Sequence, residues 1–433
     1  MKSQQSGWRG AASALIAKAG CLGLVGIALL VAEKFPGRHE QTRPCPVTLD
    51  RRLRAQDANL YLDLANRGYR QGDVTSPFYP LWPGVIRAAA PLFGGSLMGA
   101  GLVLSNVFSL LAWALFYRGV ARRWGERAAL WALIFLVSFP GSIFFQLIYT
   151  ESLFLLLTMG LWLALQGRRY AWAAVWAGLL PLCRGVGAFA VVPLGWHAFR
   201  VASPAWLRDV WARRRAAVAS GSSFDTARAR QSGGKGRGVS RYGSTSGACH
   251  AGVANDRRTG GSHEPRRSAL APWMLVATPA AGWALYLALM WHWTGNPFEG
   301  IEAQKRIGAH SIPNLWNVSK FVVGFFNPTD WHSFRGSLLD RCAFVLLLYT
   351  LPVLWRLDKG LLAWVFMLGI VPAMSGTFTS YIRFASCAFP MFIALGVVLS
   401  RREWRWWRYA LLVVFVTLHA ALVWRYVNLR WAG

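Results

Sequence analysis

Carboxylate side chains are scarce in this sequence, so their positions indicate where proton transfer is feasible. The 433 residues contain 18 Asp and Glu against 47 Lys and Arg, and six of the 18 acids fall between residues 33 and 73. In the stretch QDANLYLDLANRGY, a helical spacing puts Asp57 on the same face as Tyr61, while Asp63 points elsewhere. Asp57 is therefore a candidate general base. An N-terminal helix cap is the structural alternative, because Asp is among the best capping residues.

Three further charged residues stand at or inside apolar runs. Glu151 begins the run in IYTESLFLLL, where capping alone accounts for it, because a carboxylate in the first turn faces the positive end of the helix dipole. Arg184, in LLPLCRGVG, has no acid near it in the sequence, and an unpaired guanidinium inside a membrane is costly. It requires an anion, either a carboxylate such as Glu151 or the phosphate of a lipid substrate. Arg383, in TSYIRFASCAFP, lies nearer the end of its run, where the side chain can instead extend to the membrane surface.

Membrane-spanning helices are the elements that must position these residues. Hydrophobic residues make up 55% of the chain and charged residues only 15%, which excludes a soluble multidomain enzyme and a disordered chain. The apolar residues form blocks of about 20, the length that crosses a hydrocarbon layer roughly 30 Å thick. We therefore predict an all-α polytopic membrane protein with about eleven transmembrane helices. The predicted spans are residues 11–32, 98–117, 128–146, 150–166, 170–182, 185–199, 271–293, 338–355, 360–377, 384–400 and 409–427.

Basic residues in the short connections predict the orientation. The connections after the second, fourth and tenth spans carry Arg118, Arg122, Arg123 and Arg127, then Arg168 and Arg169, then Arg401, Arg402, Arg405 and Arg408. The positive-inside rule makes this side cytoplasmic. The N-terminus is then inside and the C-terminus outside, in a bacterial inner membrane, or in the endoplasmic reticulum membrane if the source is eukaryotic. No small-residue cleavage site closes the first apolar run, so we interpret that run as a retained span.

Two long polar segments and one insert define the predicted domain organisation. Residues 1–199 form an N-terminal transmembrane half with a large first extracytoplasmic loop at 33–97. Residues 269–433 form a C-terminal half with an external loop at 294–337. Between the halves, residues 200–268 are basic and rich in Gly, Ser and Ala, which predicts a largely disordered cytoplasmic loop that contacts anionic membrane lipids. Nucleic-acid binding is not expected, because no aromatic residues alternate with the arginines.

Motifs for metal or nucleotide chemistry are missing from the sequence. The eight His show no HExxH spacing, and the six Cys show no CxxC pair. No Walker A loop, dinucleotide fingerprint or GxSxG turn is present. We therefore predict no metal site made by clustered side chains and no chemistry on soluble nucleotides.

Five short motifs follow one another along the chain. The first external loop carries D-A, an aromatic residue, A, G-Y and F-x-P-x-x-P at Asp57, Ala58, Tyr61, Ala65, Gly68, Tyr69, Phe78, Pro80 and Pro83. The later motifs are Y-[ST]-E-x-L-F at Tyr149 to Phe154, R-x-x-G at Arg184 and Gly187, G-x-P with a following Q at Gly295, Pro297 and Gln304, and R-F at Arg383 and Phe384. In this order they resemble the PIG-V family and its bacterial relatives, membrane mannosyltransferases of the GT-C superfamily. Gln56 departs from the pattern, since the family has Trp before the Asp, and the departure bears on acceptor recognition more than on catalysis.

The resemblance implies a membrane glycosyltransferase, and mannose is the sugar it favours. The donor would be a polyprenyl-phosphate-linked sugar, used on the extracytoplasmic face with inversion, and the acceptor a lipid or a glycan. A flippase or transporter of lipid-linked sugars is the alternative from another class, and a GT-C transferase for another sugar or a protein acceptor is the nearer one. Whether a divalent cation takes part is left open, because GT-C members differ in this respect.

The resemblance also assigns roles to the matched residues. Asp57 would accept the proton of the attacking hydroxyl, and Arg184 and Arg383 would stabilise the charge that develops on the leaving phosphate. The other matched side chains are expected to bind or orient the substrate: Tyr61, Tyr149, Glu151 and Gln304.

Overall fold

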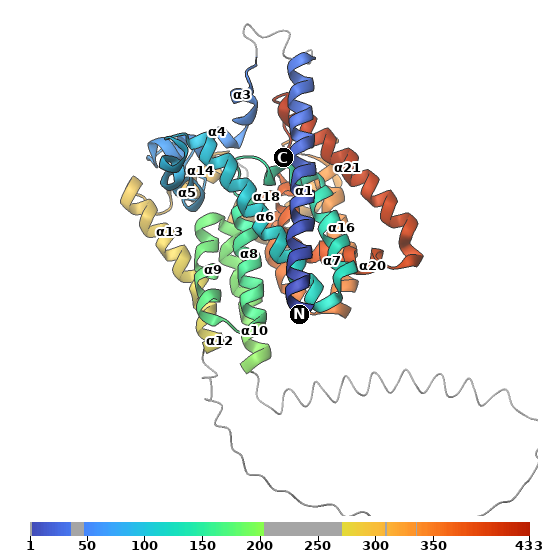
Figure 1. Cartoon of the computed structure of the whole chain (residues 1–433). Helices are drawn as coiled ribbons and strands as arrows, with labels where there is room; N and C mark the ends of the chain where they lie inside the picture. The colour runs from blue at the N-terminus through green and yellow to red at the C-terminus, as the bar shows by residue number, and fades with distance from the viewer. Residues whose placement is uncertain (1, 36–46, 203–270, 308–309, 335) are drawn as a thin grey trace, which may run out of the picture.

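Helices account for the fold of this chain. We describe a computed structural model of it, which covers all residues except 1, 36–46, 203–270, 308–309 and 335 (Figure 1). The described residues contain no β-strand. This confirms the predicted all-α class. The predicted cytoplasmic loop at 200–268 lies almost entirely outside the described residues.

Long and broken helices alternate in the N-terminal half. Two helices are long, α1 (Lys2–Lys34) and α6 (Leu97–Trp124). Between them lie the short helices α3 (Leu49–Leu53), α4 (Asp57–Arg67) and α5 (Leu81–Ala89), with the 3-10 turn η1 (Ala90–Phe93). After α6 come α7 (Glu126–Ser138), η2 (Pro140–Phe145), α8 (Glu151–Gln166), α9 (Tyr170–Cys183), η3 (Gly185–Ala190) and α10 (Val191–Ala202).

The C-terminal half repeats this mixture of long and broken helices. It begins with α12 (Ala271–Met274), η4 (Leu275–Ala277), α13 (Thr278–Thr294), α14 (Glu299–Ile307), η5 (Ile312–Trp316) and α15 (Val318–Phe326). It continues with α16 (Leu338–Leu357), α17 (Gly360–Val365), the π-helical turn η6 (Phe366–Ile370), α18 (Val371–Gly376) and α19 (Tyr381–Cys387). It ends with α20 (Phe389–Leu399), η7 (Arg402–Trp404) and α21 (Arg405–Val427).

The eleven predicted spans fall mainly on helical residues, but they differ in length, and the spans 128–146 and 384–400 cross breaks at Phe139 and Ala388. Among the described residues, six helices are long and apolar enough to cross a membrane, or seven if the α19–α20 pair, bent by 66°, counts as one span. Three further apolar helices are shorter: Glu151–Gln166, Tyr170–Cys183 and Gly360–Gly376. The chain is thus an integral membrane protein. Its short helices are compatible with a bilayer because their broken ends are buried in protein, where neighbouring groups satisfy the free backbone atoms.

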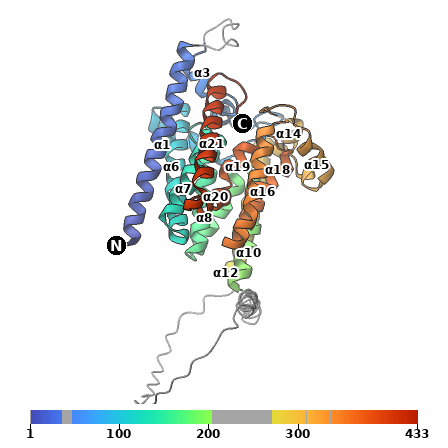
Figure 2. The same ribbon diagram turned by 90° about the vertical axis from the view of Figure 1, so that its right-hand side faces the viewer.

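The short helices of the two predicted external loops gather at one end of the bundle. Figure 1 shows α3, α4, α5 and α14 near the top, and Figure 2 places α15 at the same end as the C-terminus. The ends of α10 and α12 that flank residues 203–270 point to the opposite end, where α1 also begins. The two loops that carry Asp57 and Gln304 are therefore neighbours in space.

Glycines allow helix backbones to touch where the bundle is tightest. A Cβ at Gly282 of α13 would overlap the carbonyl group of Gly178 in α9, and a Cβ at Gly141 of η2 would overlap the carbonyl of Ile382 in α19. Small residues at such crossings are typical of helix packing in membranes, where van der Waals contact drives association. The η2–α19 contact fixes the segment that carries Arg383.

The α9–α13 crossing provides a test of this packing. We expect Gly282→Leu to lower the free energy of unfolding by about 1–3 kcal/mol, because the added side chain must push two backbones apart. Thermal unfolding in detergent measures this change. Gly195→Ala is the matched control, since no atom lies within 4 Å of a Cβ at Gly195. Equal melting temperatures for Gly282→Leu and the native protein would contradict the close crossing.

Candidate active site

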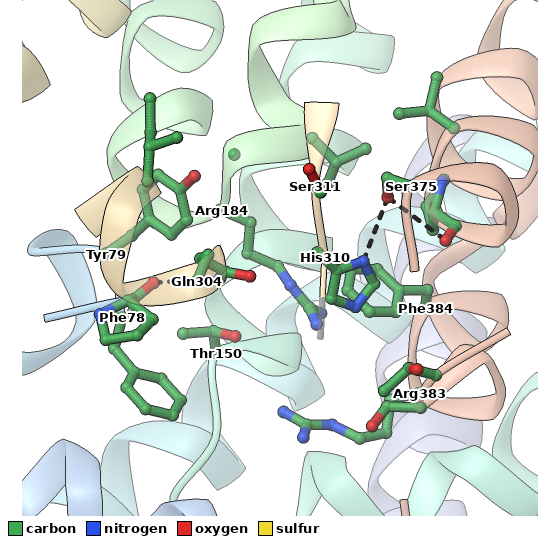
Figure 3. A pocket seen from close by; sticks show the side chains of 18 of the residues that line it. Phe78, Tyr79, Thr150, Arg184, Gln304, His310, Ser311, Ser375, Arg383 and Phe384 are labelled. Atoms are coloured by element: carbon green, nitrogen blue, oxygen red, sulfur yellow. Dashed lines mark hydrogen bonds between the residues drawn. The ribbon is translucent and has the colours of Figure 1, made fainter. Parts of the chain in front are cut away.

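A pocket of about 470 Å³ opens among the elements that carry the predicted site residues. Its lining includes Asp57 of α4, Arg184 at the end of α9, Gln304 of α14 and Arg383 of α19. In Figure 3 the guanidinium groups of Arg184 and Arg383 point into the same space. The pocket therefore joins residues from both transmembrane halves.

Arg383 lies between two carboxylates. Its Nη1 is 2.5 Å from Asp57 Oδ2, and its Nε is 2.9 Å from Glu151 Oε1. Its Cζ also lies 4.6 Å from the ring centre of Tyr149. Only 5% of Arg383 is exposed, so extension to the membrane surface is the wrong interpretation of this residue. Bound by two carboxylates and an aromatic face, the guanidinium has a defined position.

Arg184 shares one of these carboxylates. Its Nη1 is 3.3 Å from Glu151 Oε1, so the predicted partnership between Arg184 and Glu151 is present in the structure. The geometry is too poor for a hydrogen bond, and among the described residues this buried nitrogen has no acceptor. The guanidinium lies against an aromatic face, with its Cζ 4.1 Å from the ring centre of Phe384. Arg184 thus retains hydrogen-bonding capacity for a ligand in the pocket.

The two carboxylates differ in their access to the pocket. The side chain of Glu151 is 0% exposed, whereas that of Asp57 is 21% exposed and lines the pocket. Gln56 occupies the N-cap position of α4, so Asp57 is not the N-cap residue itself, although it lies in the first turn of α4 as Glu151 does in α8. Glu151 begins α8, as its capping interpretation requires, and also pairs with both arginines. Of the two, only Asp57 is placed to contact a substrate.

The remaining predicted site residues divide between the pocket wall and the layer behind it. Tyr61 lines the pocket, with its hydroxyl 3.5 Å from Thr150 Oγ1. Burial raises the pKa of Tyr61 well above its ordinary value, which keeps the hydroxyl protonated. Gln304 also lines the pocket and donates through Nε2 to the carbonyl of Pro77 at 3.4 Å. Tyr149 is fully buried behind the wall, against Arg383.

Two residues of this region were not predicted from the sequence. Asp340 of α16 accepts a hydrogen bond from the backbone N–H of Ile382 at 2.5 Å, which fixes the start of the helix that carries Arg383. His310 also lines the pocket and pairs with Ser375. No motif marked either residue, although an acid in an apolar run and a His close to the Gln304 motif were the available signals.

Metal-ligating side chains do not cluster in this part of the protein. Within the described ranges, no three His, Cys, Asp or Glu side chains come close enough together to hold a metal ion. Asp57 and Glu151 converge, but on the guanidinium of Arg383.

The apolar helices and the charged pocket at one end of the bundle define an integral membrane protein with a candidate substrate site. Residues 48–219 match the family described as Mannosyltransferase (PIG-V). This match confirms the predicted family resemblance over that part of the chain. No curated protein sequence matches the chain.

Solved structures of an archaeal oligosaccharyltransferase also match the chain. AglB from Archaeoglobus fulgidus, in complex with an inhibitory peptide and a dolichol-phosphate, is 14% identical with a TM-score of 0.40, and the match covers 95% of this chain and 56% of that one. The same enzyme in complex with Zn and sulfate is 14% identical with a TM-score of 0.44, over 95% of this chain and 53% of that one. The chain thus spans about half the length of the oligosaccharyltransferase.

The shared carboxylate predicts a large effect on stability. We expect Glu151→Gln to lower the free energy of unfolding by about 3–5 kcal/mol, because Arg383 and Arg184 lose their common buried counter-charge. Thermal unfolding in detergent measures the loss. Asp50→Asn removes the exposed pair with Arg54, 3.6 Å apart, and should change stability by less than about 1 kcal/mol. A similar small effect for both variants would show that Glu151 does not hold the site together.

Proposed function

We propose that this protein transfers a mannosyl unit from a polyprenyl-phosphate donor to an acceptor hydroxyl, with inversion, on the extracytoplasmic side of the membrane. The observation that carries the proposal is the pocket in which one accessible carboxylate, Asp57, faces two buried guanidiniums, Arg184 and Arg383. A base and a cationic phosphate site are the two parts that transfer from a sugar phosphate requires.

Asp57 is the proposed general base. The acceptor oxygen attacks the anomeric carbon, and its proton passes to the Asp57 carboxylate. The bond between the anomeric carbon and the phosphate oxygen breaks, and its electron pair leaves with the polyprenyl phosphate. Attack from the face opposite the leaving group inverts the anomeric centre. The accessibility of Asp57 and the full burial of Glu151 favour Asp57 over Glu151 for this role.

Arg184 and Arg383 are the proposed phosphate ligands. Guanidinium groups bind phosphate oxygens through several N–H donors, and such charge-assisted hydrogen bonds are among the strongest in proteins. Glu151 and Tyr149 act behind them by holding Arg383 in place. A phosphate that binds Arg383 competes with Asp57 for Nη1, so donor binding frees the carboxylate to accept a proton.

An apolar part of the same pocket supports a lipid-linked donor. The apolar residues that line it include Val186 and Phe189 of η3, Trp283 of α13, and Ile312 and Leu315 of η5. Such a surface suits an isoprenoid chain, whose burial is favourable in proportion to its apolar area. Tyr61 and Gln304 line the pocket beside the charged groups, where sugar hydroxyls would meet them.

The proposed orientation follows from the positive-inside rule. The end of the bundle that carries α4 and α14 is opposite to the end flanking the arginine-rich segment 203–270. Sugar nucleotides are confined to the cytoplasm, whereas a lipid-linked sugar is available on the other face. The acceptor would be a lipid or a glycan, and the membrane a bacterial inner membrane.

Replacement of the base tests the mechanism. We expect Asp57→Asn to reduce sugar transfer by about 10²- to 10⁴-fold, because the amide cannot accept the proton. The measurement is transfer from polyprenyl-phosphate-mannose in membranes that contain the variant at normal level. Asp63→Asn, on the same helix and outside the pocket, is the control and should retain full activity.

Full activity of Asp57→Asn would rule out this base. Proteoliposomes separate the transferase from a flippase, because only the transferase attaches labelled sugar covalently to an acceptor. Movement of the labelled donor between leaflets without attachment would contradict the proposed function itself.

Replacement of Arg184 tests the phosphate site. We expect Arg184→Gln to reduce kcat/KM for the donor by about 10²-fold, because the leaving phosphate loses a fixed positive charge. Arg184→Lys keeps the charge but loses the planar donor set, so it should recover only part of the activity. Arg87→Gln on α5, outside the pocket, serves as the matched control. Equal kcat/KM for Arg184→Gln and the native protein would remove Arg184 from the phosphate site.

A further inference from the structure

A histidine and a serine form a polar pair on the pocket wall beside the two arginines. His310 precedes η5, and Ser375 lies near the end of α18. Nδ1 of His310 is 3.1 Å from Oγ of Ser375, and Figure 3 shows this contact next to Arg184 and Phe384. The mechanism proposed above uses neither residue.

The surrounding chain holds the His310 ring in a fixed position. The backbone N–H of Ser311 donates to the carbonyl of Ser375 at 3.0 Å, which ties the two segments together. A Cβ at residue 376 would overlap the imidazole, so Gly376 provides the space that the ring occupies. The ring centre also lies 5.0 Å from that of Phe384, the residue on which Arg184 rests. A ring fixed on three sides can present its free edge in one direction only.

The hydrogen bonds of Ser375 favour one tautomer of His310. The Ser375 hydroxyl donates to the carbonyl of Pro372 at 3.4 Å, and this uses its one proton. With the hydroxyl proton on that carbonyl, Nδ1–H of His310 is the donor to Oγ. In this tautomer Nε2 has no proton, and it offers a lone pair.

Burial and the positive charges that face His310 keep it neutral. The pKa of His310 falls to about 3, first because of burial and then because of the nearby Arg184 and Arg383. One edge of the ring still reaches the pocket, which His310 lines. His310 is therefore an uncharged acceptor at physiological pH.

An unprotonated Nε2 selects the kind of group that can bind to it. The oxygens of an ionised phosphodiester have no proton to donate, so Nε2 cannot bind them. A sugar hydroxyl can donate to Nε2, and the sugar of a lipid-phosphate donor is attached directly to the phosphate that the arginines would hold. The two kinds of ligand thus separate by chemistry, with the anion on Arg184 and Arg383 and a hydroxyl on His310.

We propose that His310 accepts, through Nε2, a hydrogen bond from one hydroxyl of the sugar being transferred and so contributes to sugar specificity. This inference rests on the proposed function, since it requires a lipid-phosphate sugar in this pocket. Ser375 is a positioning residue that fixes the tautomer, and Gly376 provides the space for the ring.

The test combines two variants of the full-length protein with a set of altered donors. His310→Phe keeps a flat ring and removes the acceptor, whereas His310→Gln restores an acceptor on a side chain of similar reach. The donors are polyprenyl-phosphate-mannose and its monodeoxy analogues, each of which lacks one hydroxyl. His292→Phe, an exposed position on α13 outside the pocket, is the matched control. Each protein is assayed in membranes that contain the native acceptor.

We expect His310→Phe to lower kcat/KM for the mannose donor by about 5- to 50-fold, and His310→Gln to recover part of the loss. One deoxy donor should be poor for the native protein yet no poorer for His310→Phe, which identifies the hydroxyl. Ser375→Ala should give a smaller loss. The native pH profile between about pH 5 and 8 should show no ionisation that His310→Gln removes.

Two results would overturn the inference. The first is unchanged kcat/KM in His310→Phe, and the second is an equal additional loss with every deoxy donor in both proteins. If His310→Phe fails to accumulate, His310→Gln with the same donors decides the matter by its loss or retention of discrimination. A native protein that transfers no sugar from any lipid-phosphate donor would instead overturn the proposed function, and the inference with it.

Discussion

The shared carboxylate of Glu151 is the interaction on which the rest of the site depends. It lies fully buried between Arg383 and Arg184, at 2.9 Å and 3.3 Å. Removing two guanidiniums and a carboxylate from water is unfavourable unless each charge finds a partner. A buried carboxylate that serves both arginines therefore forces α8, α9 and α19 to converge at one level of the bundle, and that convergence creates the pocket.

Broken helices make this convergence feasible in a membrane. Each charged residue stands at or near an end of its element: Asp57 and Glu151 begin α4 and α8, Arg184 follows α9, and Arg383 lies in the seven-residue α19. Helix ends leave backbone groups without partners, which is tolerable at membrane depth only inside protein. The bends shorten these helices, and the charged side chains at the bends replace contacts that a continuous helix would have made. Close backbone contacts such as Gly141 on Ile382 keep this arrangement rigid.

Sequence patterns predicted which residues form the site better than they predicted the contacts between those residues. Hydropathy located the six described helices that are long enough to span a membrane, because crossing a bilayer leaves a long apolar signal, but it gave no sign that α8 and α9 are too short to cross alone. The motif order indicated Asp57, Glu151, Arg184 and Arg383 as site residues. The contacts in the structure then decided between the structural and the functional interpretations that the sequence spacing had left open. Asp340 and His310 were missed because their partners, Ile382 and Ser375, lie 42 and 65 residues away in the sequence. Such long-range pairs produce no local spacing pattern in the sequence.

The charge distribution in the pocket also orders the proposed reaction. Without a ligand, Asp57 is bound to Arg383, so its Oδ2 already accepts a hydrogen bond from Nη1. A lipid phosphate that binds Arg383 releases the Asp57 carboxylate. Because the sugar is attached to that phosphate, the release occurs only when a sugar is already in the pocket. Activation of the acceptor then depends on donor binding. A neutral histidine fits this arrangement. A third positive charge beside Arg184 and Arg383 would weaken the ion pairs of both arginines with their carboxylates. It would also bind the phosphate and make no contribution to the recognition of the sugar.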